Sequence, residues 1–411
     1  MVLLFVALFN SILGLSVLFP IFGPLGRSLE LSEFEVGLLS AGYALMQLLL
    51  ATTWGRKSET AGRKPILLVG VIGFAVGFAC FGITAWAGMN HLLGHGALLA
   101  LLLLSRVVGG AFSSATIPTA QAYAADLSDR EARTSAMVVI GAAFGLGVIF
   151  GPAIGAGLVE ITGGSLLAPV WFSVSVAVAN AVFIVIWLPE PESSRRKEEQ
   201  PPLREVAKKV WPILAIGLTA TVASVAMEQT VAFYFQDRLG ITEAETPKYV
   251  GAALLVYGIV AVFAQGYLVR RREMRPITLL RVGVPIALIG YVGFVFADSF
   301  TTLTIALALQ GLGQGLLLPG VTAAGSLAVD DDAQGSIAGL NSASTGLGRL
   351  FGPLVGGGLY QLLREMPGVG PELTYAFSAA LLTVVLGVLM ARPAALASEP
   401  ASDAPEDLKS D

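Results

Sequence analysis

Three ionisable side chains lie inside long apolar stretches, and they are the first candidates for chemistry in this sequence. Glu228 is the only carboxylate of the apolar stretch 211–236. An ionised group at the centre of a bilayer costs about 2.5–3.5 kcal/mol on insertion scales, so such a group usually serves a function. A carboxylate that can gain and lose a proton suits proton coupling or recognition of a cation. The alternative is a structural acid that hydrogen-bonds to a neighbouring helix.

The other two are arginines. Arg106 lies well inside the apolar stretch 97–124 and has to face the protein interior. It can hold an anionic substrate, or it can repel the proton from a nearby acid and so couple the two movements. The alternative is an arginine tied to helix-end carbonyls. Arg349, in the stretch 336–361, can line a cavity or pack against other helices.

Polar and aromatic residues along the same stretches could line a cavity between helices. For each one alone, packing or a hydrogen bond between helices is the alternative. Together they predict a midplane cavity with few charges, which suits a moderately apolar organic substrate. The predicted cavity residues, besides Arg349, are Asn10, Tyr43, Gln47, Phe112, Gln121, Gln229, Phe233, Tyr257, Gln310, Gln314 and Asn341.

The sequence contains no pattern for several other kinds of site. It has no Gly-x-x-x-x-Gly-Lys-Ser/Thr loop, so ATP is not expected to drive the protein. His91 and His95 stand without further metal ligands, and the single Cys80 allows neither an internal disulfide nor a metal site built on thiolates. No Ser/His/Asp or paired-carboxylate arrangement is evident. We therefore predict no enzyme activity, no cofactor and no metal.

The elements that position these residues are predicted to be membrane helices. Of the 411 residues, 55% are hydrophobic and 13% are charged, and the mean hydropathy is +0.76. A soluble domain carries about 25% charged residues. The net charge of −4 is too small to indicate nucleic acid or another strongly charged partner. Met1 leads directly into apolar sequence, which predicts a transmembrane helix and not a signal peptide.

Twelve stretches are long and apolar enough to span a bilayer, which takes about 20 residues. If the N-terminus is cytoplasmic, most of the 25 lysines and arginines fall in cytoplasmic segments, so both termini are predicted to face the cytoplasm. The predicted units are a six-helix bundle over 1–188, a cytoplasmic linker over 189–210, a second six-helix bundle over 211–391 and a cytoplasmic tail over 392–411. Residues 203–209 could form a short surface helix, although a solvated linker is favoured. The predicted spans are 2–26, 34–54, 65–87, 97–124, 136–161, 167–188, 211–236, 249–269, 276–297, 301–327, 336–361 and 373–391.

A glycine-proline pattern occurs twice, half a chain apart. Small residues at every fourth position share one helical face and let a second helix approach to backbone distance, and a proline within the pattern bends the helix. The same offset relates Pro118 to Pro319 and Asp129 to Asp330, which indicates an internal duplication typical of two-halved transporters. The two patterns are Gly147, Gly151, Pro152 and Gly155, and Gly348, Gly352, Pro353 and Gly356.

The segment between the second and third spans reads Gly55-Arg56-Lys57-Ser58-Glu59-Thr60-Ala61-Gly62-Arg63-Lys64-Pro65. By charge alone it is a plain basic cytoplasmic loop. It resembles the signature of the major facilitator superfamily, Gly-x-x-x-Asp-x-x-Gly-Arg-Lys. Gly55, Gly62, Arg63 and Lys64 match, whereas Glu59 stands where the acid is usually Asp.

Other stretches carry the same resemblance. Arg106, with Gly109 and Pro118 after it, is similar to the superfamily's signature in the fourth helix. The stretch around Pro152 resembles the signature of its proton-coupled antiporters. The first span is similar to that of the twelve-helix drug exporters, with Asn10 standing where an acid is often found.

The resemblance covers nearly the whole chain. It implies two six-helix bundles around a central cavity that opens alternately to either side of the membrane. It also implies a cytoplasmic charge cluster that stabilises the outward-open state. On this sequence the members of that cluster would be Glu59, Arg63 and Asp126, with Asp129 as a further candidate.

The resulting hypothesis is an all-α secondary transporter of the inner (plasma) membrane, resembling the drug:proton antiporter branch. Its partners would be a small-molecule substrate, protons and the lipid bilayer, and it would work as a monomer. It would export small hydrophobic organic compounds, with Glu228 carrying the proton and Arg106 tuning it. The alternative is a carrier of an anionic metabolite gripped by Arg106 and Arg349. A membrane enzyme or a sensor is disfavoured, because neither a catalytic cluster nor an output domain is evident.

Overall fold

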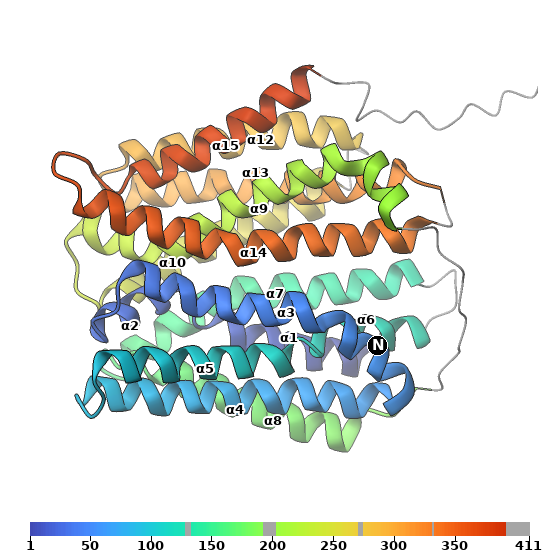
Figure 1. Ribbon diagram of the computed structural model, residues 1–411, viewed down its shortest axis with the longest axis horizontal. Coiled ribbons are helices and arrows are strands. Elements are labelled where there is room, and N and C mark those ends of the chain that lie inside the picture. Colours follow the sequence, from blue (N-terminus) through green and yellow to red (C-terminus); the bar gives the residue numbers. More distant parts are fainter. Residues whose placement is uncertain (128–132, 192–202, 270–273, 331–332, 392–411) are drawn as a thin grey trace, which may run out of the picture.

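The computed structural model describes residues 1–127, 133–191, 203–269, 274–330 and 333–391. In these residues the chain is helical, without a β-strand. Figure 1 shows the helices running roughly side by side, with the first half of the chain in the lower part of the view and the second half above it. The N-terminus and the end of the last helix lie at the same end of the molecule, as the predicted topology requires.

Each half contributes a similar series of helices. The first half contains α1 (Val2–Ser16), α2 (Phe22–Ser28), α3 (Glu33–Ala61), α4 (Arg63–Met89), α5 (His95–Ser113), α6 (Thr116–Asp126), α7 (Arg133–Ile161) and α8 (Ala168–Trp187). The second half contains α9 (Leu203–Leu239), α10 (Thr246–Phe263) with a π-helical turn (Ala264–Val269), α12 (Pro276–Phe296), α13 (Phe300–Leu327), α14 (Gln334–Glu365) and α15 (Leu373–Ala391).

Ten helical segments of the described chain are long and apolar enough to cross a bilayer. One of them, His95–Asp126, joins α5 and α6. The other two predicted spans are helical as well. The first consists of α1 and α2, separated by the turn at 17–21, and α1 alone has 15 residues. The second is α14, whose many polar and small residues lower its hydropathy.

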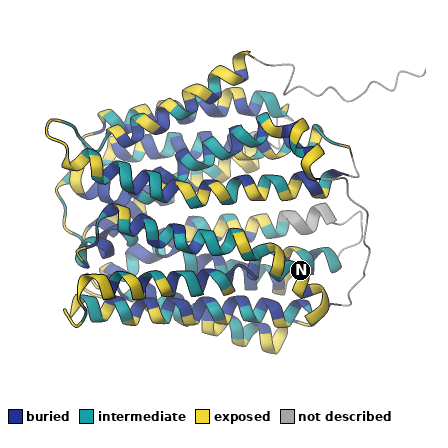
Figure 2. Cartoon of the chain, in the orientation of Figure 1, coloured by how far each residue is buried: buried dark blue, intermediate teal, exposed yellow. Residues whose placement is uncertain are grey.

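Many large apolar side chains are exposed, and Figure 2 shows exposed residues along the outermost helices. On α8, Val178, Val182 and Val185 are exposed on one helical face. On the opposite face, Asn180 is fully buried and donates from Nδ2 to the carbonyl of Ala7 on α1 at 2.9 Å. An apolar outside with polar contacts between helices is the arrangement that lipid favours.

The glycines of both glycine-proline patterns pack against the first long helix of their own half. In the first half, a Cβ at Gly151 would collide with Ser16 at the end of α1. In the second half, a Cβ at Gly352 would lie 2.7 Å from Val225 on α9. The predicted close approach is confirmed in both halves, and the matching contacts agree with the internal duplication. The corresponding pairs are Gly147 with Ile12, Gly155 with Val17, Gly348 with Thr221, and Gly356 with Ala226.

The prolines of the two patterns lie against the opposite half. The carbonyl of Pro353 on α14 lies directly over Gly37 of α3, and the carbonyl of Pro152 on α7 lies over Gly251 of α10. The two contacts are counterparts under the duplication. A side chain at either glycine would hit a backbone carbonyl, so these positions need glycine.

Contact between α3 and α14 weakens along the two helices. Gly357 lies against the backbone of Glu33 at one end. Further along, Gly346 meets the side chain of Leu48, and around Gly339 a Cβ would find nothing within 4 Å.

The seam between α7 and α10 follows the same course. Gly258 lies against the backbone of Ile149, whereas a Cβ at Gly145 would lie 3.8 Å from Val262, and Gly141 faces open space. The two halves are therefore closed at the end predicted to face outside and diverge towards the end predicted to face the cytoplasm. We call these the outer and the inner end.

The second bundle begins earlier than predicted. The helix α9 starts at Leu203, inside the predicted linker 189–210, and continues through Pro212. Val206 and Val210 pack against Ile337 of α14, and this apolar contact holds the start of the helix. The stretch is therefore neither a solvated linker nor a separate surface helix. The other domain boundaries stay predictions, and the predicted tail lies outside the described residues.

The α1–α7 contact yields a first prediction. Gly151→Ala is expected to lower the apparent Tm in detergent by several degrees, because the added methyl group overpacks the contact with Ser16, at a cost of about 1–3 kcal/mol. The control is Gly157→Ala in the same helix, where the new Cβ finds nothing within 4 Å and the change should stay within about 0.5 kcal/mol. Thermal unfolding followed by tryptophan fluorescence measures both. Equal Tm values would contradict the tight contact.

Candidate transport site

Glu228 lies on α9 between two helices that contact the first half. Its side chain is exposed, although the adjoining Met227 is buried. Ser224, one turn earlier, donates from Oγ to Glu228 Oε1 at 3.1 Å. Arg349 on α14 and Tyr257 on α10 lie within electrostatic range of the carboxylate. Glu228 therefore has a hydroxyl as its direct partner and a cation at longer range.

Arg106 on α5 is enclosed by aromatic rings. Its guanidinium carbon lies 4.5 Å from the ring centroid of Tyr43, 5.0 Å from that of Phe22 and 5.2 Å from that of Phe78. The residue is 7% exposed, and its Nε and Nη1 have no hydrogen-bond partner in the part of the chain that is described. Because ring faces attract a cation, the first half holds a fixed positive charge that is shielded from solvent.

Tyr43 on α3 connects Arg106 to the region between the halves. Its hydroxyl accepts a hydrogen bond from Ser113 Oγ at 2.7 Å. Gln47, one turn further on, interacts with the same hydroxyl, and Arg349 of the other half lies within its electrostatic range. The structure thus brings together six of the predicted site residues: Arg106, Tyr43, Gln47, Arg349, Glu228 and Tyr257.

Two other predicted cavity residues, Gln310 and Phe233, are fully buried between helices in this structure, and a third, Phe112, is 40% exposed. Gln310 is fully buried and donates from Nε2 to the carbonyl of Ala287 at 2.7 Å, which ties α13 to α12. Phe233 is fully buried beneath Arg27 at the outer end. Phe112 lies over Gly73 of α4, with its ring centroid 6.2 Å from that of Trp54. The remaining predicted cavity residues, Asn10, Gln121, Gln229, Gln314 and Asn341, are half-buried or exposed and stay predictions.

The predicted charge cluster at the inner end is present in part. Gly62 alone separates α3 from α4, and its φ of 96° is one that glycine adopts without strain. Arg63 is buried, with its Nε 2.7 Å from Asp126 Oδ2 and its Nη1 donating to Ser58 Oγ at 2.7 Å. Glu59 is exposed and forms no ion pair with any described residue, and Asp129 lies outside the described residues. The cluster therefore joins Arg63 to Asp126 and leaves Glu59 out in this conformation.

Glu190, just after α8, is a member of this region that was not predicted. Its carboxylate accepts hydrogen bonds from the backbone N–H of Arg63 and from that of Lys64, the latter at 3.0 Å. A negative charge at a helix N-terminus is favourable, because the free N–H groups and the helix dipole both attract it. No local pattern links Glu190 to α4, which lies far away in the sequence.

Comparison with known proteins places these features in a family. The sequence matches the model of the Major Facilitator Superfamily over residues 4–302 and 286–410. The chain belongs to this superfamily. The predicted fold class is thereby confirmed, and the protein is a membrane transporter by family.

Individual members of the superfamily resemble the chain over most of its length. It is 28% identical over 399 residues to Multidrug resistance protein 2 of Bacillus subtilis. This match covers 93% of the chain and 92% of that protein. It is 24% identical over 372 residues to Quinolone resistance protein NorA of Staphylococcus aureus, covering 89% and 90%. Among solved structures, a bacterial homologue of the human lysosomal transporter Spinster, in an inward-facing and occupied conformation, has a TM-score of 0.72 at 15% identity, covering 96% of this chain and 95% of that one.

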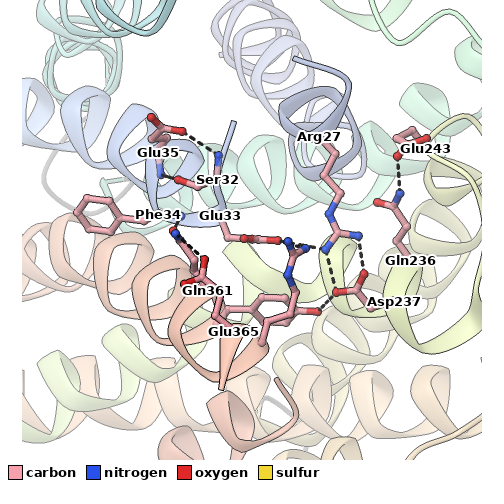
Figure 3. A network of polar contacts seen from close by, with 12 residues as sticks. Arg27, Ser32, Glu33, Phe34, Glu35, Gln236, Asp237, Glu243, Gln361 and Glu365 are labelled. Atoms are coloured by element: carbon pink, nitrogen blue, oxygen red, sulfur yellow. Dashed lines mark hydrogen bonds and ion pairs between the residues drawn. The ribbon is translucent and has the colours of Figure 1, made fainter. Parts of the chain in front are cut away.

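This superfamily member also carries a polar cluster at its outer end that was not predicted (Figure 3). Arg27 of α2 donates from Nη1 and Nη2 to the two carboxylate oxygens of Asp237 on α9, at 2.6 and 2.8 Å. Its Nη2 also donates to Glu33 at 3.1 Å, and Arg364 of α14 donates to the same Glu33 oxygen at 2.6 Å. The hydroxyl of Tyr360 donates to Asp237 at 2.7 Å. We call these five residues the outer cluster.

The first-half charges of the outer cluster are largely withdrawn from solvent, whereas the side chains of Asp237 and Arg364 are 29% and 46% exposed. The side chain of Glu33 is 3% exposed and that of Arg27 14% exposed. The guanidinium of Arg27 lies 5.1 Å from the ring centroid of Phe233. The carboxylates of Asp237 and Glu33 both accept hydrogen bonds from Arg27 and balance its charge in this partly buried place. One indication of this cluster was present in the sequence: the predicted outside loops contain few basic residues, and Arg27 and Arg364 are two of them.

The inner cluster yields a second prediction. Asp126→Asn should lower the apparent Tm and reduce transport by the superfamily member, because buried Arg63 loses its charged partner, at a cost of about 1–3 kcal/mol. Glu59→Gln, a matched change at an exposed residue of α3, should have little effect on Tm. Thermal unfolding and vesicle transport are measured for both variants. A larger loss of stability in Glu59→Gln than in Asp126→Asn would contradict the assignment of partners.

Proposed function

We propose that this transporter is a proton-coupled exporter of small hydrophobic organic compounds. Export of such compounds is supported by the full-length similarity to proteins named for multidrug and quinolone resistance. Proton coupling is supported by one observation above all, the position of Glu228 between α10 and α14, the helices of the second half that meet the first. We place the protein in the plasma membrane, as a monomer with both termini in the cytoplasm.

In the proposed cycle, Glu228 alternates between a proton and the substrate. The ionised carboxylate attracts a cationic or polarised compound that enters from the inner end, where the halves diverge. Protonation from the outside removes that attraction and releases the compound. Each proton that then moves inwards contributes about 2.3 kcal/mol per 100 mV of membrane potential, and this drives export.

Arg106 supports this cycle from the opposite half. Its aromatic cage keeps the guanidinium in place without a carboxylate to neutralise it. Tyr43 lies within electrostatic range of both Arg106 and Arg349, and Arg349 lies within range of Glu228. A fixed positive charge raises the cost of bringing a second cation into the same low-dielectric region. Arg106 would therefore favour alternate binding of the proton and the substrate over simultaneous binding of both.

A second candidate function is transport of an anionic metabolite, and the same arginines favour it. Two nitrogens of Arg106 have no partner in the described part of the chain, and Arg349 forms no ion pair there. A carboxylate could bridge them if the aromatic cage opened in another conformation. The burial of Arg106 in this structure speaks against direct contact with a substrate.

The coupling proposal is tested in everted vesicles that are energised to an acid interior and carry a pH-sensitive dye. Lipophilic cations, neutral antibiotics and carboxylate metabolites are added in turn. At least one of the first two classes should release protons with wild type and not with Glu228→Gln, because the amide cannot ionise. Glu205→Gln, at an exposed position of the same helix, is the control and should behave like wild type. Proton release by Glu228→Gln at the wild-type rate would refute the role of Glu228.

Direct binding separates the two candidate functions. In the exporter, Arg106→Ala should keep substrate affinity within a few-fold and lose proton release, because the arginine acts at a distance. In an anion carrier, the same variant should lose carboxylate binding by tenfold or more, since a charged hydrogen bond is worth about 1.5–3 kcal/mol. Affinities are measured by calorimetry on purified protein. Tight carboxylate binding that depends on Arg106 would replace the exporter proposal with the carrier.

A further inference from the structure

The outer cluster contains two kinds of ion pair. The bonds from Arg27 to Asp237 and from Arg364 to Glu33 connect the first half of the chain to the second. The bond from Arg27 to Glu33 lies within the first half, and the bond from Tyr360 to Asp237 lies within the second. The same four charges therefore hold the halves together and are also paired or hydrogen-bonded inside their own half.

Separation of the halves would divide these charges evenly. The first half keeps Arg27 with Glu33, which are already 3.1 Å apart. The second half keeps Asp237, with its hydrogen bond from Tyr360, together with Arg364. An unpaired buried charge is costly, but here each half retains one arginine and one carboxylate. Opening therefore breaks strong contacts without leaving a net charge on either side.

We propose that the outer cluster is the outer gate of the transporter, a lock that holds the outer end closed and separates into two electrically neutral halves when that end opens. This proposal assumes that the transporter works by alternating access and that the outer cluster lies at the outside face of the membrane, as the predicted orientation places it. It requires neither the proposed substrate class nor coupling through Glu228, so it can be tested when no substrate is known.

The surroundings of the cluster support a gate. The backbone contacts of Gly357 with Glu33 and of Gly37 with Pro353 bring α3 and α14 together beside the ion pairs. The ring of Phe233 beneath Arg27 is fully buried, and its centroid lies 6.1 Å from that of Tyr360. The charges are thus backed by a packed seam at the outer end, which shields Glu33 and Arg27 most, with side chains 3% and 14% exposed.

A second ion pair between the halves provides a built-in control. Lys248 on α10 and Glu160 on α7 approach to 2.8 Å at the same end, but their side chains are 62% and 60% exposed. Exposed pairs contribute about 0–1 kcal/mol, because water solvates both charges well. Each cross-half pair of the outer cluster includes one shielded partner, Arg27 or Glu33. Removing the Lys248–Glu160 pair should therefore leave the gate closed, whereas removing the pairs of the outer cluster should open it.

The test measures access from outside. Cys80, the only cysteine, is replaced by alanine, and Leu48→Cys introduces a reporter on α3 opposite Gly346, inward of the outer cluster. A membrane-impermeant maleimide is added to right-side-out and, separately, to everted vesicles. Asp237→Asn and Arg364→Gln should each raise the labelling rate from outside by about three- to tenfold, and Lys248→Gln should change it less than twofold.

Two results would overturn the gate. One is a labelling rate for both Asp237→Asn and Arg364→Gln within twofold of Lys248→Gln. The other is an increase seen only from the cytoplasmic face, which would place the cluster on the wrong side. If Asp237→Asn does not fold, Arg364→Gln decides alone, because its side chain is 46% exposed and tolerates replacement. If the labelling rates change as expected while the vesicle assay shows no proton release that depends on Glu228, the gate is retained and the coupling proposal fails.

The neutral separation has a test of its own. Arg27→Gln weakens the lock, but it leaves Glu33 without a cation in its own half once the outer end opens. The double variant Arg27→Gln/Glu33→Gln loses the lock and leaves no unpaired charge. It should therefore label from outside faster than Arg27→Gln alone. A slower or equal rate would refute the charge balance.

Discussion

The structure depends on how closely helix backbones can approach one another. In lipid, apolar side chains gain little by leaving the solvent, so helices associate through tight packing and polar contacts. Here the glycines around Pro152 admit α1, and those around Pro353 admit α9. The carbonyls of the same two prolines lie on Gly37 and Gly251 of the opposite halves. Each glycine-proline helix is therefore fixed within its own half and also forms part of the seam between the halves.

This double use explains why closure at the outer end and divergence at the inner end occur together. The seam contacts are backbone contacts at Gly357 and Gly37, and they are absent at Gly339 on the same helix pair. Rigid helices that meet at one end and separate at the other form a wedge. Ion pairs reinforce this packing at one end only. Each ion pair between the halves in the described part of the chain lies at the outer end. Packing allows the halves to touch, and the charges determine where they are held.

The sequence was sufficient for what repeats or is local, and insufficient for what depends on two distant segments. The duplication, the helix contacts at Gly151 and Gly352 and the pair of Arg63 with Asp126 follow from spacing or from the family resemblance. The position of Gln310 was not predictable, because a glutamine that hydrogen-bonds a backbone carbonyl has the same pattern as one that lines a cavity. Arg27 and Asp237 are far apart in the sequence, and nothing near either residue indicates that they meet.

The carboxylates of this protein differ in how far their charge is satisfied, and this difference supports the roles that we propose for them. Glu33 is held by two guanidinium groups, and Asp237 is held by one guanidinium and a phenol. Both acids therefore accept charged hydrogen bonds that hold helices of the two halves together. Glu228 has a serine hydroxyl as its direct partner, with Arg349 at longer range. Glu228 forms no ion pair in the described part of the chain, which fits the coupling role that we propose for it.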